Sequence, residues 1–110
     1  MKFYLKPTRT TCRKAKSWLR EKNVSVEEID LNRGFSESEL DKLIGARDYK
    51  QFLNTRNELY RERNMKEHPP SRTEAIRLMA AHPNLIRRPI LVNGAKIALG
   101  FDEEQFEQVV

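Results

Sequence analysis

The sequence predicts an α/β fold with a four-stranded mixed sheet and a helical insertion, and three observations support this prediction. An apolar run at 3–5, a helical pattern at 10–23 and a second strand at 24–31 form a strand–helix–strand unit over roughly 30 residues. Residues 36–82 carry only helical patterns. An Asn93-Gly94 turn then joins two short strands, and a last helix follows. We therefore expect a parallel first strand pair with a right-handed crossover, and an antiparallel hairpin.

The first strand and the first helix meet at a loop that contains a proline. The apolar run at 3–5 ends before Pro7, as a short buried strand does. Thr10 or Thr11 is the predicted N-terminal cap of the helix, which should end near Asn23. The residues that recur at helical spacing on its core face are Cys12, Ala15, Trp18 and Leu19.

Two capping boxes begin helices in the insertion. Ser36 and Ser71 are each followed three residues later by a glutamate, so each serine is predicted to cap a helix. Gly45 is expected to end the first of these helices, and His82-Pro83 to end the last.

The middle of the insertion, at 48–64, is predicted as two short helices. Asn54 or Thr55 is expected to cap the second one, which would leave Arg56 in its first turn. The side chains expected to face inward here are Phe52, Leu53, Leu59 and Tyr60.

After the insertion, predicted strands at 89–92 and 96–99 flank the Asn93-Gly94 turn. Asp102 is expected to cap the last helix, with Phe106, Val109 and Val110 on its apolar side. This order is that of a thioredoxin-like core, βαβ and ββα, with three helices (ααα) inserted between its halves. We expect a single domain over 1–110, with the helical insertion at about 36–82.

The composition favours a solvated protein without a metal site. Of the 110 residues, 38% are hydrophobic and 34% are charged, and the net charge of +5 arises from interspersed residues rather than from one block. A single cysteine excludes an intramolecular disulfide, and His68 and His82 are too few and too far apart to predict a metal centre. No apolar run suits a membrane span, so we expect a cytoplasmic protein that binds neither membranes nor, directly, nucleic acid.

The loop from Lys6 to Lys14 is the predicted functional centre. It leads from a strand into a helix, and the N-terminus of a helix attracts anions and lowers the pKa of a nearby thiol. Two interpretations of Cys12 stay open: a reactive thiolate, or a small apolar residue on the core face of the helix. Arg13 and Arg87 are interpreted as solvated surface residues.

Three segments stand in a recognisable order along the chain. The first runs from Tyr4-Leu5-Lys6-Pro7 to Cys12-Arg13-Lys14-Ala15, the second holds residues 54–56 with Tyr60-Arg61, and the third runs from His82 through Phe101. Together they resemble the ArsC/Spx family, the arsenate-reductase-related branch of the thioredoxin-like proteins. The resemblance extends over essentially the whole chain.

The resemblance implies an anion pocket and a substrate groove. It implies that the Arg88–Pro89 bond is cis, with Pro89 shaping the groove beside the cysteine loop. It also implies that Arg56 and Arg88 hold the anion. The place of a third family arginine falls near Phe101 or Asp102.

The sequence departs from the family pattern at the cysteine loop. Arg9 stands where the arsenate reductases carry the cysteine that attacks the oxyanion. Cys12 matches the second cysteine of the Spx-like C-x-x-C pair, so a dithiol switch within one chain is impossible. We therefore consider that Arg9 converts a catalytic loop into a binding loop.

Two functions follow from the resemblance. The first is a divergent glutathione-linked thiol or oxyanion oxidoreductase with Cys12 as its catalytic residue, or an anion-binding remnant of one. Such a protein would take a small oxyanion or glutathione as co-substrate, could work with glutaredoxin, and would have no tightly bound cofactor. The second is a non-catalytic Spx-like transcriptional regulator that binds an RNA polymerase subunit. The expected anion-binding residues are Thr8, Arg9, Thr10, Thr11, Arg56 and Arg88.

Overall fold

The computed structural model describes residues 1–110, which form two compact units. The first unit joins Met1–Leu31 to Arg88–Val110 and holds the β-sheet, whereas the second unit, Asn32–Arg87, is helical. No helix in the structure has the length and apolar character needed to span a membrane.

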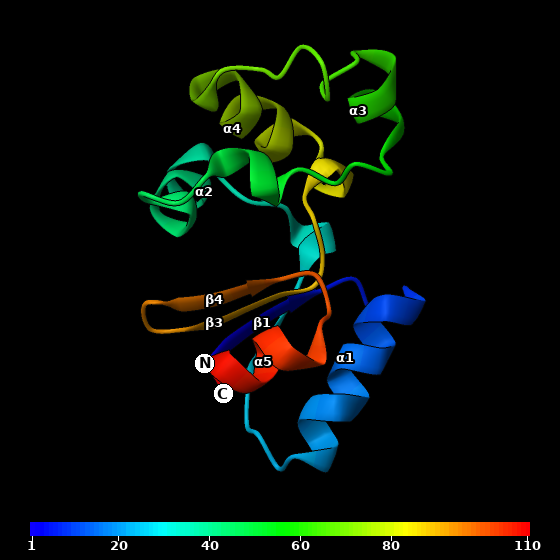
Figure 1. Cartoon of the computed structure of the whole chain (residues 1–110), viewed down its shortest axis with the longest axis vertical. Coiled ribbons are helices and arrows are strands. Elements are labelled where there is room, and N and C mark those ends of the chain that lie inside the picture. The colour runs from blue at the N-terminus through cyan, green and yellow to red at the C-terminus, as the bar shows by residue number, and fades with distance from the viewer. The chain divides into compact units, whose positions relative to one another are not determined.

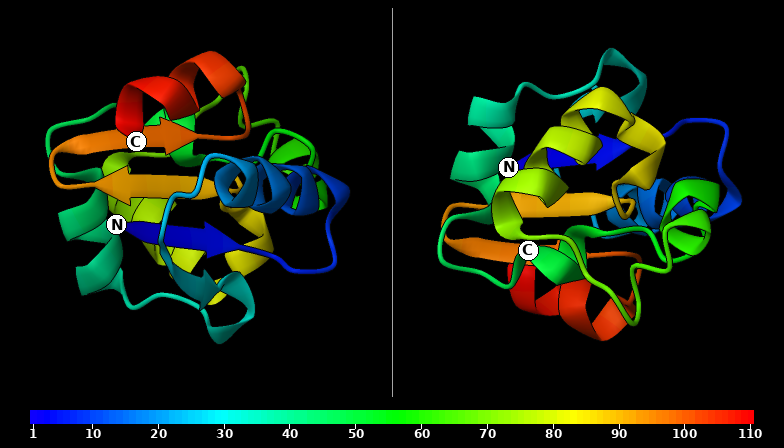
Figure 2. Two further views of the ribbon diagram at one scale, coloured as in Figure 1. Left: turned by 90° about the horizontal axis from the view of Figure 1, so that it is seen from below. Right: turned by 90° about the horizontal axis from the view of Figure 1, so that it is seen from above.

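The sheet of the first unit has four strands in the order β2-β1-β3-β4, which lie side by side in Figure 2. β1 is parallel to β2 and antiparallel to β3, and β3 forms an antiparallel hairpin with β4. The predicted mixed sheet is therefore confirmed, with its parallel pair supplied by the strand–helix–strand unit. The strands are β1 (Lys2–Leu5), β2 (Glu27–Asp30), β3 (Ile90–Asn93) and β4 (Lys96–Leu99).

Two helices, α1 (Thr10–Glu21) and α5 (Glu103–Val109), cover one face of this sheet (Figure 1). The ring of Phe106 packs edge-on against Phe3 of β1 and Trp18 of α1, with centroid distances of 6.4 and 5.7 Å. Burying side chains of this size contributes about 1.5–3 kcal/mol each. The buried cluster comprises Phe3, Leu5, Cys12, Ala15, Trp18, Leu19, Leu91, Ala98, Phe106 and Val109.

The second strand is shorter than predicted. The predicted span of 24–31 reduces to Glu27–Asp30, because the Val24 N–H donates to the Leu19 carbonyl at 3.0 Å and so belongs to the end of α1. Leu31 already begins a 3₁₀ turn, η1 (Leu31–Arg33). The helix end itself is as predicted, since Asn23 adopts a φ of 58° just beyond α1.

The hairpin turn lies one residue later than predicted. Asn93 pairs with Lys96, so the two turn residues are Gly94 and Ala95. The φ of Gly94 is 60°, whereas the φ of Ala95 is not positive. This combination is that of a type II′ turn with glycine at its first central position. The side chain of Asn93 donates instead to the Val109 carbonyl at 2.7 Å.

Two helices of the second unit begin at the serines predicted to cap them. Ser36 Oγ accepts the Glu39 N–H at 3.1 Å, and Glu39 Oε1 accepts the Ser36 N–H at 3.2 Å, which confirms the first capping box. Ser71 Oγ accepts the Glu74 N–H at 3.2 Å, but the Glu74 carboxylate pairs with Arg77 instead of closing the box. The α-helices are α2 (Glu37–Ile44), α3 (Glu58–Glu62) and α4 (Arg72–Ala81), with 3₁₀ turns at η2 (Tyr49–Phe52) and η3 (Pro83–Leu85).

Three apolar side chains are less buried than predicted. Phe52 and Leu53 lie in the core of the second unit, but Leu59 and Tyr60 are only half-buried, because the five-residue helix α3 buries none of its residues fully. Val110 follows the end of α5 and is 41% exposed.

Candidate functional site

α1 begins at a tight turn that follows β1. The Arg9 N–H donates to the Lys6 carbonyl at 3.0 Å, and Pro7 occupies the second turn position, which suits its fixed φ. The turn places Arg9 at the N-cap of α1, which corrects the predicted cap at Thr10 or Thr11. Both threonines lie in the first helical turn and are exposed.

The N-terminus of α1 is open to a ligand. The Arg9 side chain makes no capping hydrogen bond, and the first intrahelical bond runs from the Arg13 N–H to the Arg9 carbonyl at 3.0 Å. The amides of Thr10, Thr11 and Cys12 precede that bond and have no side-chain cap. Because these N–H groups lie at the positive end of the helix dipole, they favour an anion.

The thiol of Cys12 is enclosed in the core of the first unit. Its residue is 0% exposed, and its Sγ accepts the Lys6 N–H at 3.4 Å. Burial raises the pKa of the Cys12 thiol above its ordinary value, although the Lys6 N–H and the charges of Arg88, Arg9 and Lys6 act in the opposite direction. Of the two interpretations left open by the sequence, the structure supports the buried apolar residue, and a catalytic role stays a prediction.

Arg88 brings a second guanidinium to this turn. The residue is half-buried and precedes β3, and the Arg88–Pro89 bond is cis, as the resemblance implied. Burial lowers the pKa of Arg88, the positive charge of Arg9 lowers it further, and Cys12 opposes this shift. Arg9, Cys12 and Arg88 therefore act on one another electrostatically within the first unit, whereas the groove attributed to Pro89 stays a prediction.

Arg56 belongs to the second unit. Asn57, rather than Asn54 or Thr55, caps α3 by accepting the Leu59 N–H at 2.9 Å, so Arg56 precedes the helix instead of lying in its first turn. The Arg56 N–H donates to Asn54 Oδ1 at 3.1 Å, which fixes the backbone of an exposed residue. Its expected role in anion binding stays a prediction.

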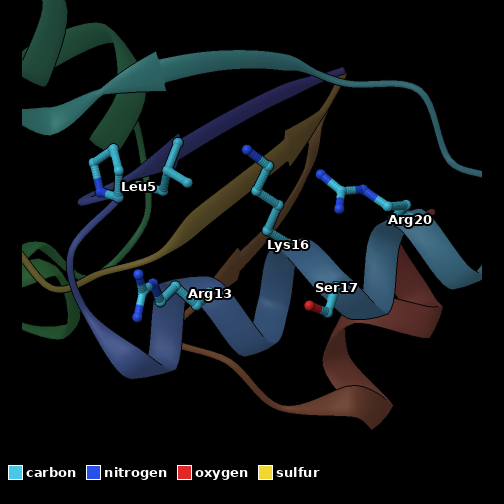
Figure 3. A pocket seen from close by; sticks show the side chains of 6 residues that line it. Leu5, Arg13, Lys16, Ser17 and Arg20 are labelled. Carbon is cyan, nitrogen blue, oxygen red and sulfur yellow. The ribbon is translucent and has the colours of Figure 1, made fainter.

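A pocket that the sequence did not predict lies beside the same turn, along α1 and next to the end of β1 (Figure 3). Its volume is about 330 Å³. Arg13 is exposed, as predicted for a solvated surface residue, and it also lines this pocket together with two further basic residues of α1. The i, i+3, i+7 spacing of these three cations was the available signal. The lining residues are Leu5, Pro7, Arg13, Lys16, Ser17 and Arg20.

The chain has no arrangement suited to a metal. No group of three or more histidine, cysteine, aspartate or glutamate side chains is placed to hold a metal ion.

The β2-β1-β3-β4 sheet, with α1 and α5 on one face and a helical segment inserted before β3, defines a thioredoxin-like α/β protein. A family model described as the ArsC family matches residues 4–109, and the chain belongs to this family.

Known proteins show the same relationship. The chain is 40% identical to the uncharacterized protein YusI of Bacillus subtilis, over 96% of this chain and 94% of that protein. It is 29% identical to the global transcriptional regulator Spx of Streptococcus pneumoniae, over 94% of this chain and 80% of the regulator. Its fold resembles that of an arsenate reductase from Vibrio cholerae with a TM-score of 0.85 and 26% identity, covering 99% and 96% of the two chains.

Proposed function

We propose that this protein is an anion-binding member of the ArsC family, in which the turn before α1 holds a small oxyanion or a carboxylate of glutathione. The observation that carries the proposal is that two like charges act on each other near a helix N-terminus without a side-chain cap, because Arg9 at that N-terminus lowers the pKa of Arg88. Two guanidinium groups repel each other, and a bound anion offsets this repulsion because both groups attract it.

The groups at the turn suit an oxyanion. A guanidinium offers a planar fork for two oxygens, and helix amides add further donors. Each hydrogen bond to a charged group contributes about 1.5–3 kcal/mol. After the costs of binding, a few such bonds correspond to a dissociation constant of roughly a millimole per litre or less. The hydroxyls of Thr8, Thr10 and Thr11 are exposed at the same turn and can donate as well.

The buried thiol favours binding over thiol chemistry. A nucleophilic cysteine must be a thiolate within reach of its substrate. Cys12 is fully buried, and its raised pKa keeps it protonated near neutral pH. Arg9 occupies the position at which the family resemblance places the attacking cysteine, so the loop retains the anion donors without the nucleophile.

Backbone resonances provide the test. Titration of the ¹⁵N-labelled protein with phosphate, arsenate or glutathione should shift the amides of residues 8–12, whereas chloride at equal ionic strength should not. Arg9→Gln and Arg88→Gln should each lower the affinity measured in this titration about tenfold, since each removes a charge-assisted hydrogen bond. Arg87→Gln is the matched control, because Arg87 is exposed and next to Arg88 in sequence. Unchanged spectra at millimolar ligand would remove the anion site.

A second candidate is a non-catalytic regulator that binds an RNA polymerase subunit. It is supported by the likeness to the regulator Spx and by the arginine that stands in place of a catalytic cysteine. Purified RNA polymerase should then retain the protein in a pull-down at low salt, and Arg9→Gln should reduce retention. Failure to form the complex at low salt counts against this candidate and leaves the anion site unaffected.

A further inference from the structure

Three basic side chains line the pocket beside α1 in a single row. Arg13, Lys16 and Arg20 lie three and four residues apart, which places them on one side of the helix. Figure 3 shows them side by side, with Lys16 between the two arginines. They do not converge on one point, so the pocket offers separated positive charges along the helix axis.

The two arginines of this row have no acidic partner. Lys16 Nζ binds Glu28 Oε1 of β2 at 3.0 Å, so its charge is already compensated. Arg13 and Arg20 are exposed and form no ion pair. Seven residues of helix separate them, which corresponds to roughly 10 Å at a rise of 1.5 Å per residue.

We infer that this pocket binds an acidic peptide segment of a partner protein, with one carboxylate on Arg13 and a second on Arg20. Carboxylates on residues two turns apart on a helix have the required spacing of roughly 10 Å. Leu5 and Pro7 are the apolar residues of the pocket lining, so an apolar side chain of the peptide packs against them, beside the peptide carboxylate that Arg13 binds.

The surroundings of the row disfavour other anions. A single phosphate fits the row less well, because the side chains of Arg13 and Arg20 lie apart with Lys16 between them and do not converge on one point. A nucleic-acid backbone is long enough, but its phosphates would meet the exposed carboxylate of Glu28 on β2, which binds Lys16. A peptide can avoid this repulsion because it can carry a neutral or basic residue opposite Glu28.

The inference does not depend on the anion site at the turn, because Arg9 and Arg88 do not line the pocket. Its failure and the failure of the proposed function are therefore separate results. The titration that reports on residues 8–12 and the assay below use different ligands and different variants.

The direct test is fluorescence anisotropy with a labelled synthetic helical peptide that carries glutamates at i and i+7 and a leucine at one end. The full chain should bind this peptide, and a version with both glutamates replaced by glutamine should bind at least about fivefold more weakly. Binding should weaken as salt rises, because exposed charges are screened. Equal binding of the two peptides would overturn the inference.

Variants of α1 locate the site. Arg13→Gln and Arg20→Gln should each lose about two- to fivefold in affinity, and the double variant more. Lys14→Gln is the matched control, since Lys14 is an exposed cation of the same helix outside the pocket. A loss with Lys14→Gln equal to that with Arg20→Gln would show a diffuse charge effect and would overturn the proposed site.

Charge exchange and competing anions complete the test. The double variant Arg13→Glu/Arg20→Glu should bind a peptide with lysines in place of the two glutamates, which supports a direct contact. Inorganic phosphate and a short single-stranded DNA serve as competitors. If either displaces the acidic peptide at a concentration that leaves its chloride control unaffected, the pocket is a general phosphate site and the peptide assignment fails.

Discussion

The two units of the chain treat their arginines differently. In the second unit, four of the eight arginines form ion pairs with acids: Arg33 with Glu39, Arg72 with Asp41, and both Arg63 and Arg77 with Glu74. In the first unit, Arg13 and Arg20 have no acidic partner, and Arg9 raises the cost of the charge on Arg88. Cations that are matched internally stabilise a fold, whereas unmatched cations are available to a ligand. The difference gives the paired arginines of the second unit a structural role and leaves Arg13 and Arg20 of the first unit available to a ligand.

The buried thiol of Cys12 contrasts most sharply with the exposed cations of the same helix, Arg13 and Arg20. Cys12 is fully buried, so alkylation by iodoacetamide requires an opening of the first unit. We expect the reaction at neutral pH to be at least about a hundredfold slower in the folded protein than in urea. Mass spectrometry of the alkylated chain measures both rates. Equal rates would show that the Cys12 thiol is accessible in the folded protein. They would support the interpretation of Cys12 as a reactive thiolate.

Arg72 should matter more for stability than any cation along α1. Its guanidinium pairs with Asp41 and donates to the Asp41 and Gly45 carbonyls at 3.2 Å each, so it caps the end of α2. Arg72→Ala should cost about 1–2 kcal/mol of unfolding free energy, allowing for solvent screening. Arg20→Ala, which breaks no ion pair, should leave the urea midpoint nearly unchanged. A larger loss with Arg20→Ala would contradict the division of roles.

Local signals predicted much of this fold. The capping box at Ser36 involves atoms only three residues apart, so the sequence alone determines it. The mixed sheet followed from the order of short elements and from the handedness of the crossover. The hairpin turn moved by one residue because the pairing of Asn93 with Lys96 is decided by the whole strand register.

The candidate site was harder to predict because it depends on where separate segments meet. Thr10 and Thr11 are good capping residues, but the turn that Pro7 begins places Arg9 at the cap position. That uncapped helix end is a local inconsistency of the kind expected at a binding site. The burial of Cys12 depends on packing against distant segments of the chain, so helical spacing left both interpretations open. The pocket beside α1 could not be predicted from helical spacing, because it forms only where Leu5 and Pro7 lie next to the basic side chains of α1.

The smallest expected effect is the pH dependence of stability that the buried thiol of Cys12 causes. Burial raises the pKa of Cys12 in the folded state, so the folded protein holds this proton more tightly than the unfolded chain. The resulting stability is complete below the unfolded thiol pKa of about 8.5 and is lost as pH rises through and above that value.

The variant Cys12→Ala removes this titration. Urea unfolding followed by the fluorescence of Trp18, the single tryptophan and a residue of the same core, should show the wild type losing more stability than Cys12→Ala between about pH 7 and pH 10. The difference between the two proteins should stay constant below about pH 7, which controls for the cavity that alanine leaves. A difference that is also constant up to about pH 10 would mean that the thiol ionises as readily in the folded protein as in the unfolded chain. In that case Cys12 would be as accessible to water as the exposed groups of the turn, and the contrast between a buried thiol and exposed cations would be wrong.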